Sequence, residues 1–159
     1  MKEQLTLDGS EYIEPTSDEW ETPHTVFNPL NARFNFTLDV CCTEQTAKCE
    51  KYFTKIEDGL KQSWRNHRVW ANFPYSNIPE WIEKAYREML TNGCELVVML
   101  LPAWTDRDWF HDWVINPIKP ISHRIVNISI EYLRGRVKFY LNGKRGKSPR
   151  FGSMVVIFK

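Results

Sequence analysis

The sequence predicts a single α/β domain built around a mostly parallel sheet. Apolar and β-branched segments that suit strands alternate with segments whose apolar residues recur at helical spacing, as expected when crossover helices join parallel strands. Residues 94–101 form a continuous apolar run, which is typical of a strand buried on both faces. The chain has 159 residues, the size of one domain.

Six further strands are predicted from β-branched and apolar runs bounded by turn formers. The run at 34–42 ends in small and polar residues, and the run at 68–72 stops before Pro74, whose nitrogen cannot donate to a strand ladder. The six ranges are 34–42, 52–54, 68–72, 122–130, 136–140 and 154–158. The last two are expected to form an antiparallel pair at the C-terminal end of the sheet.

Three helices are predicted between these strands. One follows the first strand at residues 43–51. A second begins at Pro79, whose fixed φ suits a first helical turn, and ends at Asn92-Gly93. A third begins after Thr105-Asp106, which resembles an N-cap. The helical spacing of three tryptophans places them in the core rather than on a base-stacking surface; these are Trp81, Trp109 and Trp113.

The composition excludes several classes of protein. Hydrophobic residues make up 42% of the chain, enough to bury a core, but no apolar run approaches the roughly 18 residues of a membrane span. The N-terminus lacks the basic flank and apolar stretch of a secretory signal. The cysteines contain neither a disulfide framework nor a C-x-x-C pair. We therefore expect a cytoplasmic protein without membrane, disulfide or metal.

Charge is distributed unevenly along the chain. Residues 1–22 carry seven acidic side chains and one basic one, and residues 1–15 are predicted to form an acidic arm before a domain at 16–159. Residues 134–150 carry seven basic side chains and no acidic one, which favours contact with nucleic-acid phosphates. The alternative is a solvated hairpin whose lysines protect its edge. The candidate phosphate contacts are Arg134, Arg136, Lys144, Arg145, Lys147 and Arg150.

Two polar segments follow separate predicted strands, at residues 39–42 and 72–76. Ligands of open α/β sheets bind beyond the carboxyl ends of strands, so these segments could face one crevice. The side-chain oxygen of Asn72 and the carbonyl of Phe73, held by the turn at Pro74, suit the two hydrogens of an amino group on a flat heterocycle. Tyr75 could stack on that ring. Alternatively, the segment is an ordinary strand-to-helix turn.

Several short strings occur in an order that resembles the small phage-type DNA N6-adenine methyltransferases, over about residues 18–158. The strings are Trp20-Glu-Thr-Pro23, Leu38-Asp-Val-Cys-Cys42, Asp58-Gly-Leu60, Val69-Trp-Ala-Asn-Phe-Pro-Tyr-Ser76, Leu100-Leu-Pro-Ala103, Gly135-Arg-Val-Lys-Phe139 and Phe151-Gly-Ser153. The resemblance implies a Rossmann-like domain that uses S-adenosylmethionine, without a separate target-recognition domain.

The resemblance also implies roles for particular residues. The family's Asn-Pro-Pro-Tyr motif falls on residues 72–75, with Phe73 at a position where the family usually has proline. The methionine end of the cofactor would meet the 20–23 string and Asp39, while Asp58 could reach the adenosine portion. The predicted cofactor-binding residues are Trp20, Thr22, Pro23, Asp39, Cys41 and Asp58.

The implied substrate is double-stranded DNA, read by loops because the chain has no room for a second domain. Candidate readout residues outside the basic stretch are Ser76, Asn77 and Arg107. The resemblance suggests GATC-type targets and protection of phage DNA against host restriction, in the bacterial cytoplasm. Two alternatives stay open: a methyltransferase acting on protein glutamine, and a DNA-binding relative with impaired catalysis. The absence of acids from residues 134–150 favours DNA over protein as substrate.

Overall fold

The computed structural model describes residues 20–117 and 126–159. Its elements, in chain order, are α1 (His24–Phe34), β1 (Leu38–Asp39), β2 (Lys51–Tyr52), β3 (Arg68–Ala71), a 3₁₀ turn η2 (Tyr75–Asn77), α2 (Ile78–Arg87) with its π-helical continuation η3 (Glu88–Asn92), β4 (Leu96–Pro102), α3 (Asp108–Phe110) with its continuation η4 (His111–Ile115), β5 (Ile128–Tyr132), β6 (Tyr140–Leu141), β7 (Lys144–Arg145) and β8 (Ser153–Phe158).

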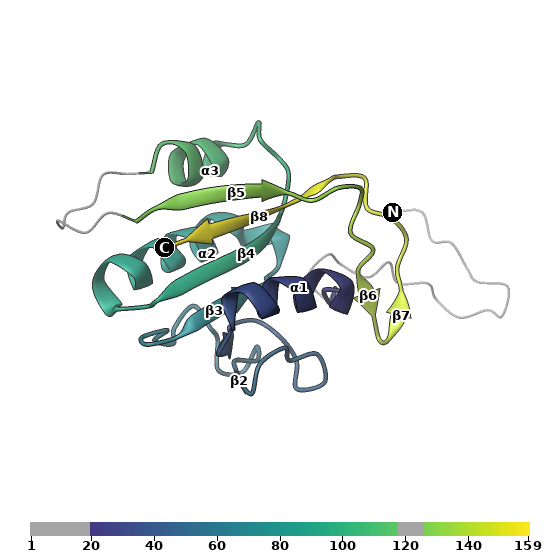
Figure 1. Cartoon of the computed structure of the whole chain (residues 1–159), viewed down its shortest axis with the longest axis horizontal. Helices are drawn as coiled ribbons and strands as arrows, with labels where there is room; N and C mark the ends of the chain where they lie inside the picture. Colours follow the sequence, from purple (N-terminus) through teal and green to yellow (C-terminus); the bar gives the residue numbers. More distant parts are fainter. Residues whose placement is uncertain (1–19, 118–125) are drawn as a thin grey trace, which may run out of the picture.

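A six-stranded sheet in the order β2-β1-β3-β4-β8-β5 forms the centre of the molecule (Figure 1). Strands β2, β1, β3 and β4 pair in parallel, whereas β8 runs antiparallel to both of its neighbours, β4 and β5. Strand β5 therefore points the same way as β4, and β8 alone is reversed. A separate two-stranded hairpin is formed by β6 and β7. The prediction of an α/β domain with a mostly parallel sheet is confirmed.

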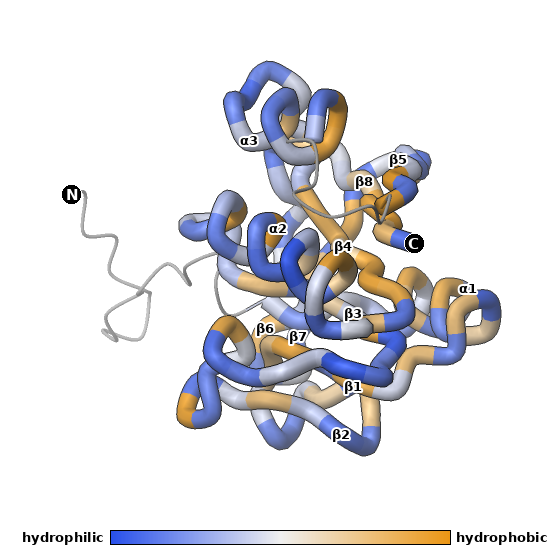
Figure 2. The backbone as a smooth tube through the Cα atoms, turned by 90° about the vertical axis from the view of Figure 1, so that its left-hand side faces the viewer, coloured by the Kyte–Doolittle hydropathy of each residue, from blue (hydrophilic) through white to orange (hydrophobic). Residues whose placement is uncertain are grey.

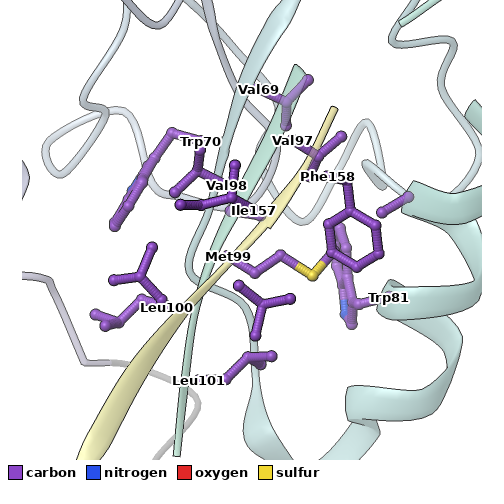
Figure 3. Packing of buried hydrophobic residues seen from close by; sticks show 14 of the residues in the cluster. Val69, Trp70, Trp81, Val97, Val98, Met99, Leu100, Leu101, Ile157 and Phe158 are labelled. Atoms are coloured by element: carbon purple, nitrogen blue, oxygen red, sulfur yellow. The ribbon is translucent and has the colours of Figure 1, made fainter. Parts of the chain in front are cut away.

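Helices α1 and α2 lie on opposite faces of the sheet (Figure 2). On the α1 face, the ring of Trp70 meets Phe27 edge-on, with ring centroids 5.3 Å apart. On the α2 face, Met99 and Phe158 lie beside Trp81 (Figure 3). Strands β4 and β8 are buried along their whole length, as a strand between two helical layers must be. The predicted buried run at 94–101 is thus confirmed.

The predicted limits of α2 are confirmed as well. Pro79 occupies the first turn, and the helical stretch ends where Gly93 adopts a left-handed φ of 76°. Trp81 and Trp109 are buried and Trp113 packs against the core, as their helical spacing predicts. The structure adds a feature that the pattern did not indicate: Glu88 is fully buried.

The first helix and first strand differ from prediction. Residues 24–34 form α1, which sequence analysis missed because Pro29 interrupts its pattern. Asn35 ends this helix with a left-handed φ of 50°, so the strand predicted at 34–42 shortens to β1. The helix predicted at 43–51 is wrong. Thr43 and Thr46 instead exchange hydrogen bonds between side chain and backbone, which compete with helical bonding in this segment.

Further corrections concern the C-terminal half. The strand predicted at 136–140 is wrong except for Tyr140, and it does not pair with 154–158, because β8 fills that position between β4 and β5. Of the strand predicted at 122–130, residues 126 and 127 are not in a strand, β5 begins at Ile128, and residues 122–125 lie outside the described part. Helix α3 begins at Asp108, and no side chain caps its N-terminus, so the predicted cap at Thr105-Asp106 is wrong.

One further prediction falls outside the described residues: the acidic arm at 1–15. None of the helices within 20–117 and 126–159 is long and apolar enough to cross a membrane. All four cysteines lie in the described part, and no disulfide joins any of them.

Gly59 is expected to be intolerant of a side chain. A Cβ at this position would overlap the backbone carbonyl of Val40, just after β1, and would also crowd the ring of Trp81. Because backbone cannot move aside cheaply, Gly59→Ala should lower the free energy of unfolding by about 2 kcal/mol or more. Urea unfolding followed by tryptophan fluorescence measures this change. Gly152→Ala is the control, since its Cβ would lie 4.0 Å from the nearest atom, in ordinary contact; equal effects at both positions would contradict the close approach.

Candidate active site

The carboxyl ends of β1, β3 and β4 lie together on one side of the sheet, which we call the carboxyl edge; the term refers to the ends of the strands and not to an edge strand. The segment before α1, residues 20–23, is hydrogen-bonded to this carboxyl edge. The side-chain nitrogen of Asn72 donates to the carbonyl of Trp20 at 3.1 Å. The next residue, Glu21, forms a two-way backbone bridge with Tyr140 at the start of the hairpin. Residues from three distant parts of the sequence, 20–21, 72 and 140, therefore meet here.

The orientation of the Asn72 side chain follows from this hydrogen bond. A backbone carbonyl can only accept, so the amide must turn its NH₂ group toward Trp20. The side-chain oxygen, Oδ1, then points the other way, and no residue of the described part donates to it. Asn72 is half-buried. The site thus contains a fixed, partly desolvated hydrogen-bond acceptor directly after β3.

Phe73 turns its side chain away from this edge and into the core. Its ring stacks on Trp81 with centroids 5.1 Å apart and planes 6° from parallel, and only 3% of the residue is exposed. Pro74 begins the 3₁₀ turn that leads into α2, and its carbonyl accepts the N–H of Asn77 at 3.2 Å. The bulk of Phe73 therefore fills the α2 face, while its backbone carbonyl still follows Asn72 in the chain.

Tyr75 is at the centre of a group of aromatic rings on the side of Asn72 toward β4. Its hydroxyl donates to the carbonyl of Leu100 at 3.3 Å, and burial raises the pKa of this phenol. Its ring meets Trp104, Phe139 and Phe151 edge-on at centroid distances of 6.3, 6.4 and 5.9 Å. Sequence analysis did not assign Trp104 or Phe151 to the site, because both lie in loops without periodicity. The available signal was their position in the sequence, since Trp104 lies shortly after the end of β4 and Phe151 lies shortly before the start of β8.

Asp39 ends β1 and is only 2% exposed. Its two carboxylate oxygens accept the backbone N–H groups of Cys41, at 3.3 Å, and Lys48, at 3.0 Å. Burial raises the Asp39 pKa to about 6, because loss of hydration outweighs the opposing hydrogen bonds from Lys48 and Cys41. The Lys48 ammonium forms a 2.6 Å ion pair with Glu21, so the Asp39 loop is joined to the segment before α1.

Thr22 and Pro23 follow in that segment, and both are buried. The carbonyl of Pro23 accepts the N–H groups of Val26 and Phe27, which starts α1. The hydroxyl of Thr22 is buried, and no described residue bonds to it. A buried hydroxyl without a partner is unfavourable by about 1–3 kcal/mol, so its presence at this edge fits a site where a polar ligand supplies the missing bond.

Asp58 lies in the loop after β2, with a left-handed φ of 57°. Its side chain accepts the N–H of Leu60 at 3.2 Å and forms a 3.0 Å ion pair with Lys61. The close approach of Gly59 to Val40 places this loop against the end of β1. Asp58 is therefore near the same edge as Asp39, with a carboxylate that is still partly exposed.

The basic hairpin is fixed to this edge through Tyr140, which pairs with Arg145 across the hairpin and with Glu21 outside it. Figure 1 shows β6 and β7 beside the N-terminal end of α1. The exposed cations in and around the hairpin are Arg134, Arg136, Lys138, Lys144, Arg145, Lys147 and Arg150. None of them forms an ion pair with a described residue. Arg136 donates to the backbone carbonyl of Pro149 at 2.8 Å, and this bond joins the two segments that flank the hairpin.

The other predicted DNA contacts lie around the aromatic group. The Arg107 guanidinium sits over the ring of Trp104, 5.6 Å from its centroid, and Arg107 is exposed. Ser76 is exposed directly after Tyr75, and the Asn77 side chain donates to Glu80 at 2.6 Å. In residues 20–117 and 126–159, no group of His, Cys, Asp and Glu side chains could hold a metal ion.

Comparison with known proteins bears on this arrangement. The family described as DNA N-6-adenine-methyltransferase (Dam) matches residues 9–159. The chain is 34% identical to the DNA N-6-adenine-methyltransferase of Escherichia phage T1, over 95% of this chain and 66% of the relative. It is 31% identical to the protein of the same name from Haemophilus phage HP1 (strain HP1c1), over 89% of this chain and 79% of that relative. The chain therefore spans slightly less than two thirds of the phage T1 protein.

The raised Asp39 pKa has a consequence for stability. The folded protein holds this proton up to about pH 6, whereas the unfolded chain releases it near pH 4, so stability contributed by the protonated form is lost as pH rises through 6. Between pH 5 and pH 7, this group should lower the free energy of unfolding by about 1 kcal/mol. Urea unfolding at both pH values, compared with Asp39→Asn, isolates the effect. The same pH dependence in both proteins would contradict it.

Proposed function

The chain belongs to the family of DNA N-6-adenine-methyltransferases, and from this premise we propose that it transfers a methyl group from S-adenosylmethionine to the N6 amino group of adenine in double-stranded DNA. The main support is the orientation of Asn72, whose hydrogen bond to Trp20 leaves its side-chain oxygen as a fixed acceptor at the carboxyl edge of the sheet. Residues 16–159 would form one Rossmann-like methyltransferase domain without a separate target-recognition domain.

The residues of the 72–75 motif would act on the amino group of the base. Asn72 Oδ1 and the Phe73 carbonyl accept its two hydrogens, which draws the nitrogen out of conjugation with the ring and directs its lone pair outward. When bound, S-adenosylmethionine supplies a methyl group on a cationic sulfur that this lone pair can attack. Alignment and polarisation are the protein's contribution, and no general base is needed before attack, because the nitrogen gives up its extra proton to water only after the new carbon–nitrogen bond has replaced the carbon–sulfur bond. Tyr75 would stack against the base, held by the surrounding aromatic rings.

The methyl donor would occupy the side of Asn72 toward β1 and β2. The unpartnered hydroxyl of Thr22 and the buried carboxyl of Asp39 support this placement, because both are polar groups withdrawn from water at the edge where a ligand can lie. The residues proposed to hold the donor are Trp20, Thr22, Pro23, Asp39, Cys41 and Asp58. Asp39 would act partly through the loop that its carboxylate organises.

DNA would lie across the basic hairpin. Its exposed cations are not neutralised by any described acid, which suits the release of counterions from phosphates. The target adenine would leave the stack to reach Asn72, at a cost of a few kcal/mol. Ser76, Asn77 and Arg107 would contact bases or nearby phosphates. We further propose GATC-type targets and a role in protecting phage DNA from restriction in the host cytoplasm.

The two alternatives are less well supported. Phe73, which stands where the family usually has proline, would favour a relative with impaired catalysis if its side chain disturbed the motif. The ring of Phe73 instead stacks on Trp81, away from Asn72. This arrangement supports an intact site for the amino group of the base. A protein glutamine substrate would leave the cations of the hairpin without a role. Both enzyme readings share the donor and Asn72, so they differ in the substrate that receives the methyl group.

Asn72→Ala should reduce methyl transfer to adenine by about 100-fold, because a fixed acceptor for the reacting amino group is lost. Transfer of radiolabelled methyl from S-adenosylmethionine to duplex DNA, with digestion to identify N6-methyladenine, measures the change. Binding of S-adenosylmethionine, measured by calorimetry, should stay close to that of the unmodified protein.

Asn28→Ala is the matched control for this experiment, since Asn28 is exposed on α1. The control should retain full transfer. Loss of donor binding in Asn72→Ala as large as the loss of transfer would instead mean that Asn72 acts by holding the Trp20 segment. Absence of labelled adenine with the unmodified protein, under conditions where the donor binds, would contradict the proposed function.

Replacing Lys144, Arg145 and Lys147 together by alanine should weaken DNA binding and reduce its salt dependence. Each lost phosphate contact lowers the slope of log K against log salt concentration by about 0.9, so the slope should fall by about 2–3. Fluorescence anisotropy at several salt concentrations provides the measurement. The control removes the same charge from the opposite edge of the sheet, through Lys51, Arg65 and Lys159; a similar fall there would move the DNA surface away from the hairpin.

A further inference from the structure

Ser153, the first residue of β8, has a buried hydroxyl without a described partner. The residue is 1% exposed, and its Oγ atom bonds to no described residue. Within residues 20–117 and 126–159, the hydroxyl of Thr22 is the only other buried side-chain oxygen or nitrogen in this condition. Withdrawing a hydroxyl from water without a replacement bond is unfavourable, so each such group requires an explanation. A ligand that completes the bond is one.

The register of the sheet places Ser153 on the same face as Asn72. Residues paired across neighbouring strands share a face, and Ser153 pairs with Pro102. Every second residue of a strand faces the same way, so Pro102, Leu100 and Val98 of β4 share this face. Val98 in turn pairs with Trp70 of β3. Trp70 faces α1, and Asn72 follows it by two residues. Both polar side chains therefore belong to the α1 face at the carboxyl edge of the sheet.

Ser153 lies on the opposite side of Asn72 from the proposed donor residues. Strands β1 and β2 lie on one side of β3, whereas β4 and β8 lie on the other. Tyr75 belongs to this second side, because its hydroxyl bonds to Leu100 of β4. Its ring also contacts Phe151, two residues before Ser153. The Ser153 hydroxyl is thus near the aromatic rings against which the target base would stack.

We propose that Ser153 is a specificity-determining residue that donates its hydroxyl hydrogen to a ring nitrogen of the extruded adenine. This inference rests on the proposed function and adds the contact that recognises the base apart from its amino group. The adenine ring nitrogens N1, N3 and N7 are acceptors without hydrogen, and a serine hydroxyl can rotate to donate. Asn72 and the Phe73 carbonyl hold the amino group, so the ring requires a separate contact.

A purely structural role for Ser153 predicts a different result from the one expected here. Since its hydroxyl makes no bond in the described part, Ser153→Ala should leave the melting temperature of the ligand-free protein unchanged or slightly higher. The same substitution should reduce kcat/KM for DNA about 3- to 10-fold, the effect of one neutral hydrogen bond. Thr22→Val is the matched variant on the donor side, and it should weaken binding of S-adenosylmethionine while Ser153→Ala does not.

The decisive experiment removes the partner atom from the substrate. Duplexes carry 1-, 3- or 7-deazaadenine at the position that the unmodified protein methylates, so that one ring nitrogen becomes C–H in each. One of these duplexes should lower kcat/KM of the unmodified protein about 3- to 10-fold and should have no further effect in Ser153→Ala. Equilibrium binding of the same duplexes, followed by anisotropy without donor, should show the same non-additivity.

The outcomes separate the inference from the proposed function. If ordinary duplexes are methylated but all three analogues affect the unmodified protein and Ser153→Ala equally, the Ser153 contact is wrong and the reaction stands. A marked fall in melting temperature for Ser153→Ala would also overturn the inference, since it would reveal a structural role. If the unmodified protein methylates no adenine, both proposals fail.

Discussion

The hydrogen bond from Asn72 to the carbonyl of Trp20 joins the carboxyl edge of the sheet to the segment before α1. It joins the end of a central strand to a segment about fifty positions earlier in the chain, and it fixes the orientation of an amide that could otherwise turn either way. Ordering that segment costs conformational entropy, and two further contacts help to offset this cost. They are the Glu21–Lys48 ion pair and the Glu21–Tyr140 bridge. The neighbouring residues Trp20 and Glu21 therefore hold this segment at the carboxyl edge through three separate contacts.

Asp39 shows how burial and hydrogen bonding oppose each other at the same edge. Two backbone N–H groups favour its charged form, yet withdrawal from water raises the pKa to about 6. Its carboxylate replaces helical hydrogen bonds with a polar loop at residues 41–48. Together with the hydrogen bonds between Thr43 and Thr46, these bonds compete with a helix in this segment, although it contains reasonable helix formers. The Asp39 carboxyl, which we propose to contact the methyl donor, thus also organises the loop beside it.

The sequence was informative where a single periodicity decided the outcome. The buried strand β4, the limits of α2 and the core tryptophans follow from continuous or helical apolar patterns, and all were predicted. Helix α1 was missed because its Pro29 breaks the pattern and its stability comes from contacts with the sheet, such as Phe27 on Trp70. The orientation of Asn72 and the unpartnered hydroxyls of Thr22 and Ser153 depend on tertiary contacts, which no local pattern contains.

The reversed strand β8 explains how the basic residues reach the carboxyl edge. Strand β5 runs parallel to β4 and ends at Tyr132 on that edge, and β8 starts there at Ser153 because it runs the other way. Everything between them, residues 133–152, must therefore leave and re-enter the sheet at one edge, and all seven cations of the basic stretch lie in this excursion. A parallel strand at the position of β8 would have required a crossover to the opposite edge and would have carried part of that charge away. The antiparallel insertion thus brings the basic side chains, Phe139 and Phe151 beside Tyr75, and the Ser153 hydroxyl to the same end of the strands as Asn72.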